Sequence, residues 1–420
     1  MGKINVICAT AAKPNPGMAS VDLAFHALAA RHGFADQTTF WQLGTATELH
    51  AGKAAREQAE LASREALPFA YQNAWGRLEE ICGGDAIVFW GDFQHMAHYR
   101  QDIGGRLAKL NLVPTAEAGI KWADRLFLLS EAPDAVLAKT ISCGTNLLFN
   151  QAADYQDPDY GPLLHRFVKG IGSIWMRDPF SAMAVSRIRQ EFTPDHLGFD
   201  CSLFLREDDL KPLSRQWTLD PALGQGKVGL FFHRSSLSES TLCGFALELC
   251  KELDAEAQWL PWRMPSQKRA SQLGWGNFFR IDQIRIDTPP TLGDLYELLR
   301  RYRLVITDTY HVCVNAWRLG IPAVCIGETD PKCDWDVSAG PAFAWREKRQ
   351  IFHAMYDAQD FFAHASELNR SSWRRQRIRQ LASLLQRPEI AAGVRQRLLA
   401  QRDSVEKDLV HSIRRLVVGK

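Results

Sequence analysis

The segment Leu304–Lys332 most constrains the fold, because one complete structural unit is visible in its sequence. A β-branched apolar run, Leu304–Ile306, is followed by polar residues and then by an apolar helical segment, Val312–Leu319. A Gly-Ile-Pro turn then precedes a second apolar run, Ala323–Ile326. The order strand, helix, strand predicts a parallel sheet with helical crossovers.

His311 lies where the first strand of this unit gives way to its helix. Residues at that point line the carboxyl edge of a parallel sheet, beside a helix N-terminus whose free N–H groups favour anions. A histidine there can bind a phosphate or transfer a proton near neutral pH, although a histidine after a strand is more often an ordinary loop or capping residue. The position makes His311 a candidate catalytic residue.

A second segment has the same organisation, with an apolar strand at Ser173–Met176 and an amphipathic helix at Ala182–Gln190. Between them stands Arg-Asp-Pro-Phe-Ser, in which Asp178 or Ser181 can cap the helix. Arg177 comes directly after the strand. Its guanidinium offers a fixed, bidentate positive charge at the edge of the predicted sheet.

The order of these motifs resembles that of the polysaccharide pyruvyl transferase family. Arg-Asp-x-x-Ser opens a helix, a later aspartate (Asp200) precedes an apolar patch, and His-helix-Gly-Ile-Pro-strand leads to an Asp-Pro-Lys ending at Lys332. The resemblance extends from about Ile4 to Lys332. It implies two Rossmann-like α/β domains facing a cleft, similar to GT-B glycosyltransferases, and transfer of a pyruvyl group from phosphoenolpyruvate to a saccharide as a ketal.

Three places differ from the family pattern. The arginine two residues before the family histidine is Thr309 here. The amino-terminal Asn-x-Gly-Asp loop appears only as Asn15-Pro16-Gly17, with Asp22 further on. The Gly-Gly-Gly after the second buried strand is replaced by Phe-Trp-Gly-Asp-Phe, which ends at Phe93.

The resemblance, together with positions at strand ends, assigns the candidate site residues. His311 is expected to be the general acid/base, and Arg177 to act with it on the donor. Phosphoenolpyruvate carries a carboxylate and a phosphate, so its site needs fixed cations, and indole rings can stack on apolar sugar faces. The donor-binding candidates are Lys332, Arg177, Ser181, Asn15 and Gly17; the acceptor or secondary candidates are His233, Arg234, Arg263, Asp308 and Trp335; Asp92, Asn146 and Trp262 are further lining candidates.

Two other functional classes stay open. One is a GT-B glycosyltransferase with a nucleotide-sugar donor, and the other is a non-catalytic saccharide-binding relative. A Rossmann dehydrogenase is disfavoured because no Gly-x-Gly-x-x-Gly follows the first predicted strand, Ile4–Ala9.

The 420 residues, 46% of them hydrophobic, are enough for two cores. The predicted domains are residues 1–210 and 227–370, with a helical tail at 371–420 that packs back on the first domain. The charged, turn-rich segment Leu205–Lys227 is the expected linker. Further strands are expected at Ala86–Trp90, Arg125–Ser130, Ile141–Phe149, Lys227–Phe232, Ala257–Leu260 and Ile284–Ile286.

Charge and apolar patterning exclude several partners. Lys+Arg 50 nearly balances Asp+Glu 48, which argues against broad nucleic-acid binding. No run approaches the ~18 apolar residues of a membrane span, and the amino terminus does not have the pattern of a signal peptide. A cytoplasmic enzyme is therefore expected; peripheral membrane contact stays open.

The nine cysteines are scattered without a Cys-x-x-Cys pair, so they are expected to be reduced core residues, and no metal site is expected. The resemblance implies no cofactor, with phosphoenolpyruvate as the donor substrate. The implied acceptor is a saccharide or a lipid-linked saccharide. The sequence does not determine the oligomeric state.

Overall fold

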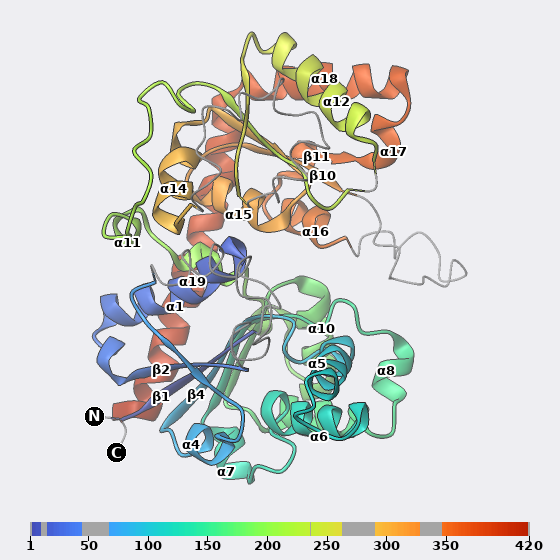
Figure 1. Cartoon of the computed structure of the whole chain (residues 1–420). Coiled ribbons are helices and arrows are strands. Elements are labelled where there is room, and N and C mark those ends of the chain that lie inside the picture. The colour runs from blue at the N-terminus through green and yellow to red at the C-terminus, as the bar shows by residue number, and fades with distance from the viewer. Residues whose placement is uncertain are drawn as a thin grey trace.

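The computed structural model describes residues 2–9, 15–43, 67–235, 237–262, 290–327 and 347–418. Two sheets lie one above the other, each enclosed by helices (Figure 1). Every strand pairs in parallel with its neighbours. The predicted α/β architecture of two Rossmann-like halves is confirmed by this topology.

The first half contains a six-stranded sheet in the order β3-β2-β1-β4-β5-β6. Its strands are β1 (Ile4–Cys8), β2 (Thr38–Gln42), β3 (Tyr71–Asn73), β4 (Ala86–Asp92), β5 (Thr140–Thr145) and β6 (Ser173–Met176). Its helices are α1 (Pro16–His32), η1 (Ala35–Gln37), α4 (Leu78–Cys82), α5 (Ala97–Lys109), α6 (Ala116–Phe127), α7 (Asp134–Ala138), α8 (Ala152–Gln156), α9 (Tyr160–Gly170), α10 (Pro179–Arg189), η2 (Thr193–His196), η3 (Cys201–Phe204) and α11 (Glu207–Leu210).

The second half contains a five-stranded sheet in the order β11-β10-β9-β7-β8. Its strands are β7 (Val228–Phe231), β8 (Ala257–Trp259), β9 (Leu304–Thr307), β10 (Ala323–Gly327) and β11 (Phe362–His364). Its helices are α12 (Glu239–Glu252), α14 (Leu292–Arg301), α15 (Tyr310–Arg318), α16 (Lys348–Met355), η7 (Gln359–Phe361), α17 (Ala365–Leu368), α18 (Ser371–Leu385) and α19 (Pro388–Val418).

Strands of the first sheet are apolar on both faces because both faces are covered by helices. In β4, Val88 and Trp90 pack on the side of α1, whereas Ile87 and Phe89 pack on the side of α5 and α6. The apolar core on the α1 side continues without a break into the second half. The two halves are therefore joined by buried apolar surface as well as by the chain.

One strand prediction is wrong. Arg125–Ser130 was expected to be a strand, but its first residues form the last turn of α6 and the remainder is a turn. Leu126 and Phe127 continue the helical spacing of buried Ala123, and Asp124 forms a bidentate ion pair with Arg100 of α5 at 2.6 and 2.7 Å. Helix packing against α5 decides the structure of this apolar run, which is too short for its period to be read unambiguously. The strand expected at Ile284–Ile286 lies outside the described residues.

The segment between the two sheets contains α11 and turns, and it is held against the start of α14. The backbone N–H groups of Gln216 and Trp217 donate to the carboxylate of Asp294, at 3.0–3.2 Å. Asp294 also belongs to the capping box of α14 with Thr291.

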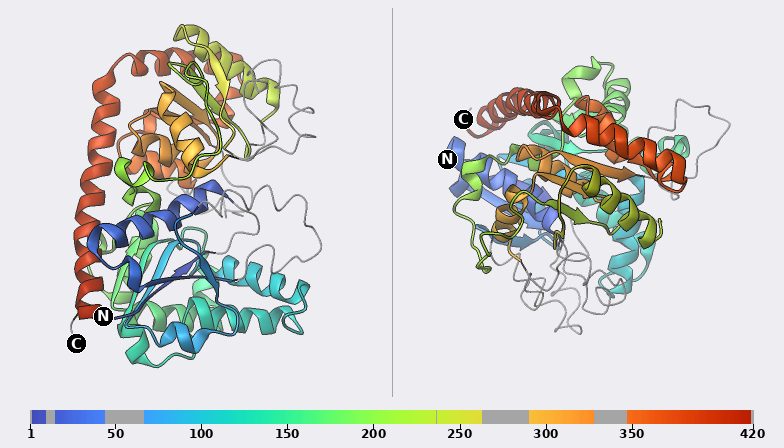
Figure 2. Two further views of the ribbon diagram at one scale, coloured as in Figure 1. Left: turned by 60° about the vertical axis from the view of Figure 1, so that its left-hand side comes forward. Right: turned by 90° about the horizontal axis from the view of Figure 1, so that it is seen from above.

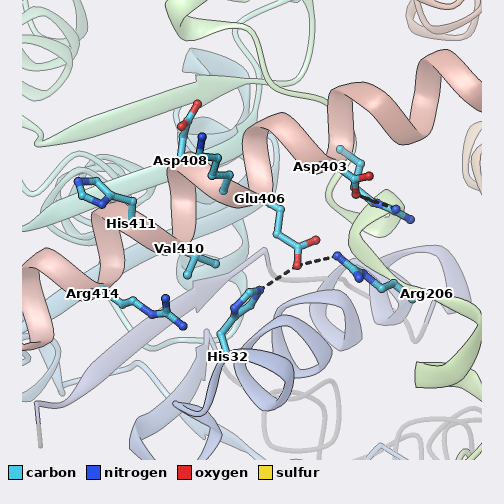
Figure 3. A pocket seen from close by; sticks show the side chains of 10 residues that line it. His32, Arg206, Asp403, Glu406, Asp408, Val410, His411 and Arg414 are labelled. Atoms are coloured by element: carbon cyan, nitrogen blue, oxygen red, sulfur yellow. Dashed lines mark hydrogen bonds and ion pairs between the residues drawn. The ribbon is translucent and has the colours of Figure 1, made fainter.

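The carboxyl-terminal helices divide between the halves. Helix α18 packs on α12 in the second half, whereas α19 runs along the side of both halves and ends near the amino terminus (Figure 2). Buried Glu406 of α19 accepts hydrogen bonds from His32 of α1 at 2.9 Å and from Arg206 at 3.1 Å (Figure 3). Arg31 lies 3.4 Å from the same carboxylate. We call Glu406 and these three partners the α19 cluster. It joins α19 to the first half.

No helix in the described part of the chain is both long and apolar enough to cross a bilayer.

Candidate functional site

Polar side chains from the ends of both sheets meet between the halves. Asp92 ends β4, Arg177 follows β6, Asp200 caps η3, and His311 lies in the first turn of α15. All four are at least nine-tenths buried. We call these four residues the junction cluster.

The backbone at the end of β4 directs Asp92 toward this cluster. Gly91 and Asp92 have φ values of 72° and 55°, so two successive residues adopt the left-handed conformation. That conformation is unfavourable for a residue with a side chain and is concentrated at functional sites. A Cβ on Gly91 would lie 2.5 Å from Cγ1 of Val21, so only glycine fits there. The carboxylate of Asp92 reaches Nη1 of Arg177 at 3.2 Å.

Arg177 lies between two aromatic rings, one from each half. Its Cζ is 5.2 Å from the ring centres of Phe93 and Tyr310, within the range of cation–π contact. Burial opposes its charge, yet Tyr310, Asp92 and Asp200 keep the pKa of Arg177 above its ordinary value. Its Nη2 has no hydrogen-bond partner among the described residues. A buried guanidinium with an unused donor is suited to binding an anion.

Asp200 connects Arg177 and His311. Its Oδ2 lies 4.0 Å from Nη1 of Arg177 and 3.8 Å from Nδ1 of His311, while its Oδ1 accepts hydrogen bonds from Ser202. Burial alone would raise the pKa of Asp200, but His311, Arg177 and Ser202 lower it below its ordinary value. Asp200 is therefore a fixed negative charge beside the imidazole.

The surroundings of His311 favour the neutral imidazole. Burial lowers its pKa, and the charges of Asp200 and Asp92 only partly oppose this effect, while Lys348 and Arg177 add to it. Among the described residues, Nδ1 has no hydrogen-bond partner. A neutral imidazole with an available nitrogen beside a carboxylate can accept a proton from a substrate hydroxyl.

Gly17 packs directly on the ring of His311. A Cβ on Gly17 would come within 2.6 Å of Cβ and Cγ of His311, closer than any side chain can lie. Asn15 caps the same helix by accepting the N–H of Gly17 at 3.0 Å, and Pro16 begins it. The backbone at the beginning of α1 therefore fixes the position of the imidazole.

Asp308 organises the loop that carries His233 and Arg234 at the end of β7. Its carboxylate accepts the N–H groups of His233, Arg234 and Ser235 at 2.7–2.9 Å. Thr309, which stands where the family has arginine, donates to Asp308 at 3.0 Å. Asp308 holds the loop in place through hydrogen bonds, and Arg234 is exposed above it.

The other candidates are distributed as follows. Ser181 donates to Asp178 at 2.6 Å and accepts from the N–H of Leu147 at 2.8 Å, so its hydroxyl is used within the first half. Asn146 and Trp262 are buried. Lys332, Arg263 and Trp335 lie outside the described residues.

Sequence reasoning did not assign four residues that the structure brings together. Asp200 was recognised in the motif order but given no role, although an aspartate at that spacing was a usable signal. Phe93 and Tyr310 stand beside recognised residues, but nothing local shows that both rings contact Arg177. Lys348 begins α16 in the sequence Glu-Lys-Arg, which is indistinguishable from an ordinary exposed helix start.

Comparisons with known proteins agree with the motif order. A sequence model of the polysaccharide pyruvyl transferase family matches residues 81–330. This span contains the whole junction cluster, whereas Gly17 and Lys348 lie outside it. No curated protein matches the chain.

Among solved structures, the chain is similar to a UDP-GlcNAc 2-epimerase from Neisseria meningitidis bound to UDP-GlcNAc, with 10% identity, a TM-score of 0.46 and 94% of each chain covered. It is also similar to the kitacinnamycin glycotransferase, with 14% identity, a TM-score of 0.43 and 99% of each chain covered. The functional conclusion depends on the family match and on the geometry, and not on these distant likenesses.

Proposed function

Because the chain belongs to the polysaccharide pyruvyl transferase family, we propose that it transfers the pyruvyl group of phosphoenolpyruvate to two hydroxyls of a saccharide, forming a ketal. The observation that carries this proposal is the buried Arg177–Asp200–His311 arrangement within the matched span. It combines an anion-binding group with an acid/base group, the two elements that a reaction of an anionic enol ester requires.

Arg177 binds the donor in this proposal. Phosphoenolpyruvate is strongly anionic, and Nη2 of Arg177 has a hydrogen-bond donor to offer. Asp92 and the two aromatic rings hold the guanidinium in place before the donor arrives. Such preorganisation lowers the cost of binding, because the guanidinium is already held in one position.

His311 transfers the proton. It takes the proton of the first saccharide hydroxyl and delivers it to the methylene carbon of the donor, while the hydroxyl oxygen bonds to the adjacent carbon. The second hydroxyl then displaces phosphate from that carbon, and its proton leaves with the phosphate. The products are the ketal, whose methylene has become a methyl group, and inorganic phosphate, so all atoms balance.

Asp200 stabilises the imidazolium that forms between these two transfers. Its Oδ2 lies 3.8 Å from Nδ1 of His311, and a negative charge at that distance favours the protonated ring. No cofactor takes part in this reaction. A saccharide, free or attached to a lipid carrier, is the proposed acceptor, and the proposed site of action is the cytoplasm. Identifying the acceptor would decide whether a lipid carrier is present.

The test is ligand-induced stabilisation followed by a product assay. Phosphoenolpyruvate at 100 times its dissociation constant should stabilise the native state by about 2.7 kcal/mol, and a nucleotide-sugar should not. With a saccharide acceptor, phosphate release should accompany pyruvyl incorporation. Stabilisation by a nucleotide-sugar, with release of a nucleoside diphosphate, would instead establish a glycosyltransferase. Saccharide binding with no turnover of either donor would indicate a non-catalytic relative.

A further inference from the structure

We infer that Lys348 is a second donor-binding cation, which acts with Arg177 to hold the phosphate group of an anionic substrate between the two halves. The inference rests on the proposed function for the identity of the donor. Lys348 lies beyond the family-matched residues, and its site is assigned here from geometry.

Lys348 and Arg177 contact the same pair of rings. Nζ of Lys348 lies 4.9 Å from the centre of the Phe93 ring and 5.3 Å from that of Tyr310. Cζ of Arg177 lies 5.2 Å from both centres. Phe93 and Arg177 belong to the first half, whereas Tyr310 and Lys348 belong to the second. The two cationic side chains, one from each half, therefore lie beside the same two rings.

The two cations are not equally neutralised. Arg177 has Asp92 at 3.2 Å and Asp200 at 4.0 Å. Lys348 has no carboxylate within ion-pair distance in the described part of the chain, although the neighbouring Arg349 is paired with Glu347. In this described part, the half-buried ammonium faces two aromatic rings and a second cation without a paired carboxylate, an arrangement that a bound anion would stabilise.

The electrostatics of Lys348 agree with this placement. Burial, and after it the charge of Arg177, lower its pKa to about 8, with Asp92 opposing them and Arg234 and Arg349 adding to the effect. The ammonium therefore loses its proton within an accessible pH range. An anion bound beside it would favour the protonated form.

A phosphate group fits this pair better than a carboxylate does. Several oxygens of a phosphate group can accept at once, from Nη2 of Arg177 and from Nζ of Lys348. A carboxylate has only two oxygens with which to reach both donors. We therefore assign the phosphate, rather than the carboxylate, to this subsite.

The experiment measures binding of inorganic phosphate, phosphoenolpyruvate and pyruvate to the full chain by calorimetry. Lys348→Met should weaken binding of the two phosphate compounds by about 10- to 100-fold, the loss expected for a hydrogen bond to a charged partner, and should leave pyruvate binding almost unchanged. Lys348→Arg should restore most of the affinity. Lys109→Met, at an exposed position on α5, is the matched control and should bind as the parent does.

A pH series separates a direct charge from a structural role. Parent affinity for phosphate should fall as the pH rises from 7.5 to 9.5, because the free ammonium has a pKa near 8. Lys348→Arg should remove this dependence, since arginine stays charged throughout. If Lys348 had only a structural role, arginine at this position would not make phosphate binding independent of pH.

The outcomes distinguish this inference from the proposed function. If the parent binds phosphoenolpyruvate and Lys348→Met binds it equally well, the inference is wrong and the proposed function stands. If the parent binds phosphate through Lys348 but transfers no pyruvyl group, the subsite is correct and the proposed reaction is wrong. If the parent binds no phosphate compound, both are wrong. Loss of pyruvate binding in Lys348→Met would overturn the assignment to phosphate.

Discussion

The junction cluster and the α19 cluster both group charged side chains where separate parts of the fold meet, but they differ in burial and in how their carboxylates are paired. Glu406 has three partners within 3.4 Å, the guanidinium groups of Arg206 and Arg31 and the imidazole of His32. In the junction cluster, Nη2 of Arg177 and Nδ1 of His311 have no hydrogen-bond partner among the described residues.

This difference separates a structural group of charges from a functional one. A buried charge whose partners all come from the protein contributes to holding elements together. Buried groups with unused hydrogen-bonding capacity and shifted pKa values are instead concentrated at binding and catalytic sites. Substitutions in the α19 cluster should therefore change stability, and substitutions in the junction cluster should change function.

The largest expected effect is at His311. His311→Gln keeps a polar side chain of similar size but cannot transfer the proton, so turnover should fall about 10²- to 10⁴-fold. Donor affinity should change far less, and the unfolding midpoint should stay close to that of the parent. Steady-state kinetics and calorimetry on the same preparation measure these quantities. Full turnover in this variant would exclude His311 as the acid/base group.

Gly17→Ala tests whether backbone packing positions the imidazole. The added methyl group would lie 2.6 Å from His311, so the ring must move, and a displacement of about 1 Å can reduce turnover about 10²-fold. Gly105→Ala is the control, because a Cβ there meets nothing within 4 Å. If both variants have equal turnover, the contact does not matter for the reaction.

Glu406→Gln tests the α19 cluster. It removes the negative charge that pairs with Arg31 and Arg206 and should lower the free energy of unfolding by about 2 kcal/mol, measured in urea, without changing turnover in the remaining folded enzyme. A loss of turnover at unchanged stability would contradict the division between the two clusters.

The same variant gives a pH test. Burial raises the pKa of Glu406, but the hydrogen bond from His32 and the charges of Arg31 and Arg206 lower it to below its ordinary value of 4.5. A carboxylate with a lowered pKa contributes stability above about pH 4.5, and this contribution is lost as the pH falls through the folded-state pKa. Urea midpoints of parent and Glu406→Gln should therefore converge below pH 4.5. A constant difference down to pH 3 would count against the ion pairs.

The smallest expected effect is a gain in stability on replacing Lys348. The pKa of Lys348 is lowered from 10.5 to about 8, so at pH 7 the folded protein holds a charge that it disfavours. Lys348→Met should raise the stability of the ligand-free protein at pH 7 by about 1–2 kcal/mol, and this gain should shrink as the pH rises from about 8 towards 10.5, because the parent lysine then loses its proton in the folded state first. Thermal melts at pH 7 and 10 measure it. A lower melting temperature at pH 7 would mean that the rings hold Lys348 for structural reasons.

Much of the fold was predictable because long apolar runs bounded by turns have few alternatives. Strand β6 has the predicted bounds, and β9, α15 and β10 differ from prediction by one or two residues. The strand predicted at Arg125–Ser130 was wrong because only contact with α5 distinguishes the end of a helix from a strand in this run. Strands β3 and β11 were not predicted, since each has three residues and lies at the edge of its sheet; β2, which lies inside the first sheet, was not predicted either.

The sequence by itself determined the alternation of strands and helices, and with it the placement of Arg177 and His311 at strand ends, because hydrophobic period and turn residues are local properties. Only the tertiary structure decided which strand ends face each other. It brought Asp200 between Arg177 and His311, set Gly17 on the imidazole, and directed Lys348 to the rings that contact Arg177. These contacts join residues far apart in the chain. They depend on how two separate cores and α19 pack together, and no local pattern encodes that packing.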